Sequence, residues 1–376
     1  MTSASAITLL VGTTKGGFTY TSDAARVAWR ADGPYLLGSK VNEMAVDARP
    51  PGTWLMAAKP GHLGPTVFRR EAASASWVEA ARPPAFPKVE GEGGRSVAHV
   101  FCFAPGNADQ PGLWWAGTSP VGLFRSTDHG ATWEGVAGFN DGLYPRIKDA
   151  VMEVPEGSIL HSIQVDPRDG AHLYVALSTG GVFESSDHGA TWSPLNAGIA
   201  APFLPEPDAP YGHDPHALAL HPRMPDRVYQ QNHCGIYRLD RPGTRWTRIG
   251  ESMPRDVGDI GFGIALHPRD PDTLWVMPMD GTDVWPRTSV GGRPAVYRSS
   301  DGGASWQRQD KGLPAAAWFT VKRQALCADS SDPVGVYFGT GSGEIWMSAD
   351  AGASWRQIAA HLPPVLSVDV VSAPCA

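Results

Sequence analysis

The sequence predicts an all-β protein, a seven-bladed β-propeller with four antiparallel strands in each blade. Two observations carry this prediction. A stretch with the pattern S-x-D-x-G-x-[ST]-W occurs four times, at Ser126–Trp133, Ser185–Trp192, Ser299–Trp306 and Ser348–Trp355. A longer unit of short, strand-like apolar runs surrounds these copies and recurs along nearly the whole chain. Repeats of this length are typical of propellers and solenoids.

Each residue type of the repeated stretch has a use in a tight turn. A serine and an aspartate two positions apart hydrogen-bond nearby backbone amides and fix the turn. The glycine takes a backbone conformation that a side chain would penalise. The tryptophan begins the next strand and buries a large ring. Because an apolar run such as Gly181-Val182-Phe183 precedes the stretch, we expect each copy to form the turn of a β-hairpin.

The four copies resemble the motif of the Asp-box (BNR) repeat proteins, a group that includes sialidases and propellers of other function. They match that motif residue for residue. The resemblance implies a β-propeller whose boxes lie on outer hairpin turns, away from the active site. The resemblance therefore predicts the architecture, and the active-site residues are expected outside the boxes.

The unit at 161–198 shows the predicted blade most clearly. An inner strand at 161–165 is followed by a strand at 172–177, a third at 181–184, the repeated turn, and a fourth strand that starts at Trp192. The same order predicts six complete blades, at about 41–80, 97–138, 161–198, 216–253, 262–313 and 322–361.

The two ends of the chain supply the seventh predicted blade. Residues 7–33 contain three strands and lack an inner one, whereas residues 365–370 have the pattern of an inner strand. Pairing the ends would close the ring and remove the exposed edges of a linear array. We therefore expect a single propeller domain over residues 1–376.

Composition and charge narrow the expected partners. The net charge is −7 and there is no run rich in Lys and Arg, which argues against nucleic acid or a membrane as the partner. Four cysteines without a C-x-x-C spacing favour a reduced compartment. The apolar run Ile7–Gly12 is too short for a signal peptide. These features predict a cytoplasmic protein with a small-molecule substrate, and they leave the oligomeric state open.

Four histidines are the predicted metal ligands. His99, His161 and His216 each lie six residues before the proline that closes an inner strand, on three consecutive blades. His233 is expected on the same face, in a loop of the next hairpin. Imidazole binds Zn, Mn or Fe, and three converging rings leave positions open for water and substrate. The alternative is that each histidine caps a strand or forms a hydrogen bond across the channel.

Loops expected on the same face as the four histidines supply further candidate site residues. Long loops inside a compact repeat fold are usually functional, and their mixture of aromatic and charged residues suits a small polar or sugar-like ligand. Asp214, Asn42 and Gln324 are candidates to orient the imidazoles. The candidate proton carriers are Tyr144, Tyr211 and Glu153, and the candidate substrate-binding residues are Arg146, Arg287, Trp318 and Arg323.

These residues favour a metal-dependent hydrolase or lyase, and three alternatives stay open. The first is a sialidase-like glycoside hydrolase without a metal, although the expected F/Y-R-I-P segment is replaced by Gly12-Thr13-Thr14-Lys15-Gly16-Gly17. The second is an oxygenase, because carotenoid-cleaving oxygenases are seven-bladed and hold iron with four histidines. The third is a non-catalytic interaction propeller.

Overall fold

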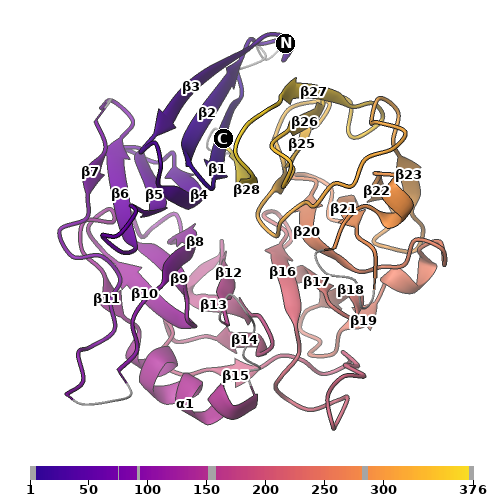
Figure 1. Cartoon of the computed structure of the whole chain (residues 1–376). Coiled ribbons are helices and arrows are strands. Elements are labelled where there is room, and N and C mark those ends of the chain that lie inside the picture. Colours follow the sequence, from indigo (N-terminus) through magenta and orange to yellow (C-terminus); the bar gives the residue numbers. More distant parts are fainter. Residues whose placement is uncertain (1–5, 75, 91–93, 151–157, 282–286, 372–376) are drawn as a thin grey trace. The chain divides into compact units, whose positions relative to one another are not determined.

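The strands of the protein form seven four-stranded sheets in the computed structural model, which describes residues 6–74, 76–90, 94–150, 158–281 and 287–371 (Figure 1). This is the seven-bladed β-propeller that the sequence predicts. The chain divides into two compact units, Met1–Leu37 with Ala219–Ala376, and Gly38–Leu218. Whether the whole chain is one domain stays a prediction.

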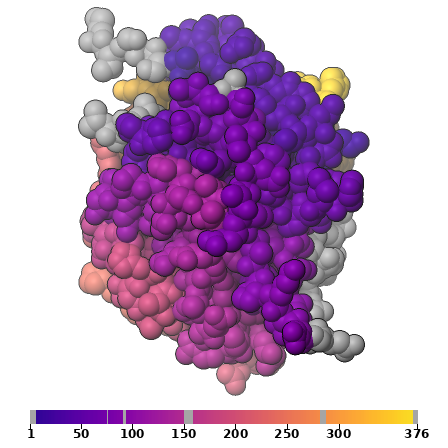
Figure 2. Space-filling model, turned by 90° about the vertical axis from the view of Figure 1, so that its left-hand side faces the viewer, coloured from indigo at the N-terminus to yellow at the C-terminus, as the bar shows by residue number. Residues whose placement is uncertain are grey.

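Three complete sheets belong to the unit Gly38–Leu218, whose side chains cover most of the face drawn in Figure 2. Listed in chain order, their strands are β4 (Lys40–Asp47), β5 (Thr53–Lys59), β6 (Thr66–Glu71) and β7 (Val78–Glu79); β8 (His99–Pro105), β9 (Trp114–Ser119), β10 (Gly122–Ser126) and β11 (Glu134–Gly135); and β12 (Leu160–Asp166), β13 (Asp169–Leu177), β14 (Gly181–Ser185) and β15 (Ser193–Pro194).

The remaining four sheets include all the strands of the unit formed by the two chain ends. One of them begins with β16 (Pro215–Leu220), the strand in which the unit boundary falls. The remaining strands of that sheet are β17 (Arg227–Asn232), β18 (Gly235–Asp240) and β19 (Thr247–Arg248). The three other sheets consist of β20 (Gly261–Leu266), β21 (Leu274–Pro278), β22 (Val296–Ser299) and β23 (Gln307–Gln309); β24 (Leu326–Ala328), β25 (Val336–Gly339), β26 (Ile345–Ser348) and β27 (Arg356–Ala359); and β28 (Val365–Val370), β1 (Thr8–Thr13), β2 (Gly16–Ser22) and β3 (Trp29–Tyr35).

The predicted pairing of the chain ends is confirmed. Strand β28 pairs antiparallel with β1, so that Val368 lies opposite Val11 and Val370 opposite Leu9. All four of these side chains are buried in one apolar cluster with residues of β25 and β26. The C-terminal strand therefore completes the sheet of the N-terminal hairpin and also buries the apolar surface of the neighbouring sheet.

The repeated S-x-D-x-G-x-[ST]-W stretch forms the expected hairpin turn. In the copy at Ser126–Trp133, the Ser126 hydroxyl donates to Asp128 (2.8 Å) and accepts the Gly130 N–H (2.9 Å). Asp128 also accepts the backbone N–H of Thr132 at 2.8 Å. The same three bonds recur in the other three copies, because the motif supplies the same donors and acceptors each time.

A second repeated turn follows the first strand of several sheets. A polar side chain at the end of the strand accepts the backbone N–H two residues later, which closes the turn. The residues at this position are Asp47, Asp166, His221, His267 and Asp329. The sequence analysis assigned no function to His221 and His267, and the structure shows both as turn-forming residues.

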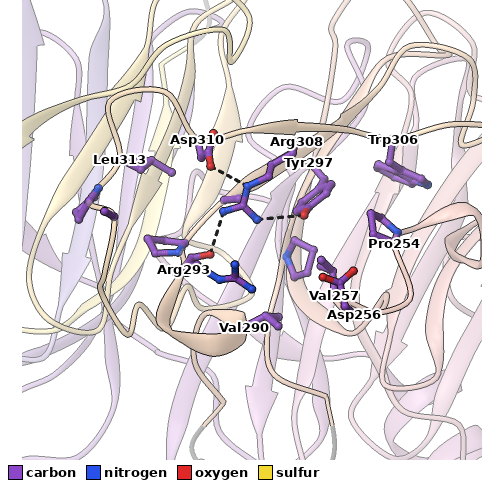
Figure 3. A pocket seen from close by; sticks show the side chains of 15 residues that line it. Pro254, Asp256, Val257, Val290, Arg293, Tyr297, Trp306, Arg308, Asp310 and Leu313 are labelled. Atoms are coloured by element: carbon purple, nitrogen blue, oxygen red, sulfur yellow. Dashed lines mark hydrogen bonds and ion pairs between the residues drawn. The ribbon is translucent and has the colours of Figure 1, made fainter.

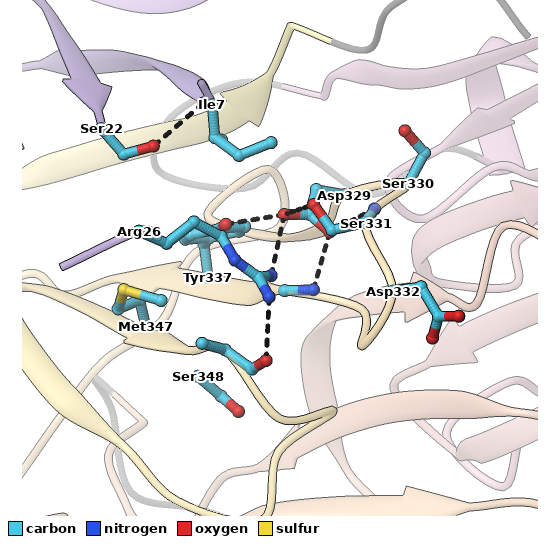
Figure 4. A network of polar contacts seen from close by, with 12 residues as sticks. Ile7, Ser22, Arg26, Asp329, Ser330, Ser331, Asp332, Tyr337, Met347 and Ser348 are labelled. Atoms are coloured by element: carbon cyan, nitrogen blue, oxygen red, sulfur yellow. Dashed lines mark hydrogen bonds and ion pairs between the residues drawn. The ribbon is translucent and has the colours of Figure 1, made fainter. Parts of the chain in front are cut away.

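Asp329 extends this turn into a buried network within the unit formed by the chain ends (Figure 4). Its carboxylate accepts the Gly335 N–H at 2.7 Å and the Tyr337 hydroxyl at 2.8 Å. The guanidinium of Arg26, from the turn between β2 and β3, lies 3.5 Å from the same carboxylate and donates to the Ala349 carbonyl at 3.1 Å. The network therefore joins the N-terminal hairpin to the sheet β24–β27.

The loop after β11 contains a short helical segment in place of the irregular loop that the sequence predicts. A π-helical turn, η1 (Gly138–Leu143), runs into α1 (Tyr144–Ile147) and the 3-10 turn η2 (Lys148–Ala150). Phe139, Leu143 and Ile147 are buried in one cluster. Their spacing of four residues places them on one helical face, a pattern that the sequence analysis missed. Within the described residues, no helix is long and apolar enough to cross a membrane.

We expect a histidine in the sheet β12–β15 to make stability depend on pH. His172 Nε2 lies 2.7 Å from Glu184 and its Nδ1 lies 3.3 Å from Asp166. The bond to Glu184, above all, raises the pKa of His172. The stabilisation is fully present below the ordinary histidine pKa of about 6.5 and is lost as the pH rises through the higher folded-state pKa. Urea unfolding at pH 6 and pH 8.5 should show a smaller pH effect for His172→Gln than for the wild type, and an equal effect would contradict this assignment.

Candidate functional site

The predicted metal-binding histidines of the unit Gly38–Leu218 lie where the sequence places them, at the beginnings of first strands. His99 begins β8, and His161 and His216 are the second residues of β12 and β16. Their side-chain contacts differ. His161 lies with Nε2 2.8 Å from the Pro215 carbonyl and Nδ1 3.0 Å from the Ser162 hydroxyl. Both nitrogens of this ring are therefore engaged with protein oxygens, and a metal would have to displace one of them.

His216 has a carboxylate beside it. Its Nε2 lies 3.3 Å from Asp214, whose other oxygen accepts the Thr179 N–H at 3.1 Å. This is the pairing in which a carboxylate orients an imidazole, the role predicted for Asp214. Asn42, the second candidate for that role, instead donates to the Val100 carbonyl at 2.9 Å.

The fourth predicted ligand, His233, lies in the unit formed by the chain ends, in the turn between β17 and β18. Its Nε2 is 3.5 Å from the guanidinium of Arg287, which also donates to the Asp280 carbonyl at 3.0 Å. The Arg287 side chain is almost fully buried, with 6% of the residue exposed. Because a guanidinium is a donor only, Nε2 is the acceptor in this contact, and a metal bound at that nitrogen would have to displace the arginine.

The predicted proton carriers contribute to packing. The guanidinium of Arg95 lies 4.2 Å from the centre of the Tyr144 ring and 3.9 Å from the centre of the Phe86 ring. Tyr211 is stacked on Phe183, with ring centroids 6.1 Å apart. Both tyrosines pack against the same apolar cluster. Their catalytic role stays a prediction, and Glu153 lies outside the described residues.

Two of the predicted substrate-binding residues, Arg146 and Arg323, differ in their surroundings: the first is exposed and the second lies near an aromatic ring. Arg146 is exposed and donates to the Gly142 carbonyl at 2.9 Å. Arg323 lies with its guanidinium 5.3 Å from the centre of the Phe262 ring.

Trp318 is 68% exposed, although its neighbour Phe319 is buried in an apolar cluster. The indole packs on Gly292, where an added Cβ would come within 2.7 Å of the ring. Trp318 is therefore a flat aromatic surface that is held in place and faces solvent.

Each of the two units contains a pocket among its described residues. The smaller, of about 400 Å³, lies around Arg95 and Phe86. The larger, of about 720 Å³, lies beside β22 and β23. The sequence analysis assigned no role to Tyr297, Arg308 or Asp310, which line this larger pocket. A signal was available, because Tyr297 and Arg308 flank the third copy of the repeated turn at positions that become cross-strand neighbours.

The fold and these sites define a β-propeller with aromatic and charged residues on its connecting loops. No family model matches the chain, so the Asp-box assignment stays a prediction. The chain is similar to curated enzymes named xyloglucanases: 28% identical over 236 residues to one from Paenibacillus sp. and 28% over 235 residues to Xgh74A from Acetivibrio thermocellus. Each match covers 57% of this chain, and 21% and 25% of the respective relatives. The matched regions are thus a quarter or less of those proteins.

Solved structures show the same fold. An ancestral GH74 enzyme superposes with a TM-score of 0.59 at 18% identity, over 85% of this chain and 38% of that one. The GH74 enzyme of Niastella koreensis gives a TM-score of 0.56 at 14% identity, over 95% and 65% of the two chains. At these identities the likeness concerns the propeller fold alone.

Proposed function

We propose that this protein is a glycoside hydrolase that acts on a neutral polysaccharide of the xyloglucan type. The observation that carries the proposal is the sequence similarity to two enzymes named xyloglucanases over more than half of the chain. In the sequence analysis a sialidase-like glycoside hydrolase without a metal was an alternative to the metal-dependent enzyme, and the similarity to xyloglucanases favours a glycoside hydrolase.

The described loops offer groups suited to such a substrate. Sugar rings present apolar faces and hydroxyl edges, so their sites combine aromatic surfaces with a few placed polar groups. Trp318 supplies an exposed aromatic face. Arg323 is the proposed partner of sugar hydroxyls, in keeping with its predicted substrate-binding role.

Hydrolysis without a metal would use two carboxyl groups, one as acid and one as base or nucleophile. Candidates on described connecting loops are Asp214, Asp256 and Asp280. Replacing each by asparagine removes the charge with little change in shape. If the proposal holds, at least one replacement should lower the hydrolysis rate by about 100-fold or more, with unfolding unchanged.

A metal-dependent hydrolase remains the second candidate, favoured by the Asp214–His216 pair. The proposed ligands are the predicted ones, His99, His161, His216 and His233. Elemental analysis of the purified protein beside His216→Ala tests this candidate. A stoichiometric transition metal that is lost in the variant would support it, and hydrolysis that persists in a metal-stripped protein would exclude it.

We expect Trp318→Ala to weaken polysaccharide binding by about tenfold. Loss of one aromatic stacking surface costs on the order of 1–1.5 kcal/mol, and the exposed side chain contributes little to the core. Affinity electrophoresis in a xyloglucan-containing gel measures the change, with the melting temperature as the check on folding. The exposed apolar Val27, which lies in the turn between β2 and β3, offers a control, since Val27→Ala should leave retention unchanged. Equal retention of Trp318→Ala and the wild type would contradict the role of the tryptophan.

A further inference from the structure

The larger pocket lies in the unit formed by the chain ends, beside β22 and β23 (Figure 3). Its volume of about 720 Å³ is within the range of about 300–1,000 Å³ usual for small-ligand sites. Four prolines, Pro254, Pro278, Pro294 and Pro314, form part of its wall. Because proline backbones are stiff, much of the pocket is shaped before any ligand arrives.

A cross-strand pair supplies the central polar groups of the pocket. Tyr297 and Arg308 face each other across β22 and β23. The Arg308 guanidinium donates to the Tyr297 hydroxyl at 3.3 Å, to Asp310 at 2.7 Å and to the Arg293 carbonyl at 3.5 Å. Figure 3 shows these three contacts around one guanidinium. The arginine is thereby fixed in position, and the tyrosine hydroxyl, which accepts one bond, keeps its own hydrogen to donate.

The charges that line the pocket balance. Arg293 and Arg308 are cationic, whereas Asp256 and Asp310 are anionic. A ligand with a net charge of either sign would meet a like charge in this lining. A neutral polyol meets donors and acceptors together and can use both, since each hydroxyl is a donor and an acceptor.

Aromatic groups complete the lining and connect it to the exposed tryptophan. The indole of Trp306 lines the pocket and is held by a bond from Nε1 to the Ile249 carbonyl at 3.2 Å. Val290 and Arg293 line the pocket on the segment that includes Gly292, the glycine on which Trp318 packs. The pocket and the Trp318 surface therefore share one short stretch of chain.

We propose that this pocket is a binding site for a short neutral oligosaccharide. The identity of the sugar, a fragment of a xyloglucan-type polysaccharide, rests on the proposed function. The site itself rests on the stiff walls, the fixed Tyr297–Arg308 pair, the balanced charge and the neighbouring Trp318 surface. Low reorganisation on binding is the physical advantage of such a pre-formed site.

Isothermal titration of the whole protein with xyloglucan-derived oligosaccharides tests the proposal. Tyr297→Phe removes only the hydroxyl and should weaken binding about fivefold to tenfold, as expected for the loss of one hydrogen bond. The matched control is Tyr237→Phe, because Tyr237 faces Arg248 across β18 and β19 in the same register but lies outside the pocket. This control should bind as the wild type does.

The remaining outcomes separate the pocket from the enzyme. Binding that is unchanged in both Tyr297→Phe and Arg293→Ala, or no binding by the wild type, would overturn the pocket proposal whether or not hydrolysis is observed. Conversely, the wild type could bind the oligosaccharide without hydrolysing it, with binding weakened in Tyr297→Phe and unchanged in Tyr237→Phe. That result would uphold the pocket proposal and overturn the proposed activity. Tighter binding of an anionic sialoside than of the neutral sugar would also contradict the pocket proposal, since the lining carries no excess positive charge.

Discussion

Asp329→Ala is expected to lower the free energy of unfolding by about 3–5 kcal/mol, the range for breaking a buried ion pair by removing one partner. Asp329 is 1% exposed and accepts bonds from Gly335, Tyr337 and Ser331. Its removal would leave the Tyr337 hydroxyl and the Gly335 N–H without this acceptor, and the Arg26 guanidinium without its counter-charge. Buried donors that lose their acceptor carry the desolvation cost.

Urea unfolding of the whole protein measures this effect. Asp332→Ala is a control of the same residue type on the same loop, because 93% of the Asp332 side chain is exposed and its oxygen is 3.9 Å from Arg269. Removal of such a surface charge should change stability by no more than about 0.5 kcal/mol. A loss below about 1 kcal/mol in Asp329→Ala would show that the network contributes little to holding the N-terminal hairpin.

Truncation after Pro364 is expected to abolish the cooperative thermal transition. It removes β28, and with it the buried side chains of Val365, Val368 and Val370. The loss of three buried valines costs several kcal/mol, at about 1.5 kcal/mol or more for each, which is comparable with the total stability of a typical domain. The edge of β1 would also be left unpaired, and unpaired edges promote aggregation.

A truncation after Val371 keeps β28 whole and serves as the matched control. Differential scanning calorimetry should show a single sharp transition for the control and none for the shorter protein. A cooperative transition in the shorter protein, within a few degrees of the control, would mean that the chain ends are not required for folding.

The repeated architecture could be predicted because its determinants are local. The serine, aspartate and glycine of each turn bond to one another within eight residues, as in Ser126, Asp128 and Gly130. The joining of the chain ends could be predicted from counting, since one blade lacked an inner strand and one strand was left over. The helical turn at Phe139–Ile147 was missed because it lies in a loop, where the expectation of irregular structure overrode a visible four-residue spacing.

The candidate site was less predictable, because it depends on side-chain contacts that repeat counting does not define. The strand position of His161 was predicted correctly, yet no pattern in the chain indicated that its ring would bond to Pro215 and Ser162. Arg287 was expected to meet substrate, and the structure shows it buried beside His233. The larger pocket went unnoticed because Tyr297 and Arg308 are eleven residues apart, on either side of a turn that was interpreted only as architecture.

The central claim is that the protein hydrolyses a xyloglucan-type polysaccharide. The most direct test incubates the purified whole chain with xyloglucan in the presence of a chelator and measures the release of new reducing ends. The account predicts steady release, which is reduced in Trp318→Ala and absent with an α-linked glucan as substrate. No release from xyloglucan, together with no retention of the protein in a xyloglucan gel, would contradict the account.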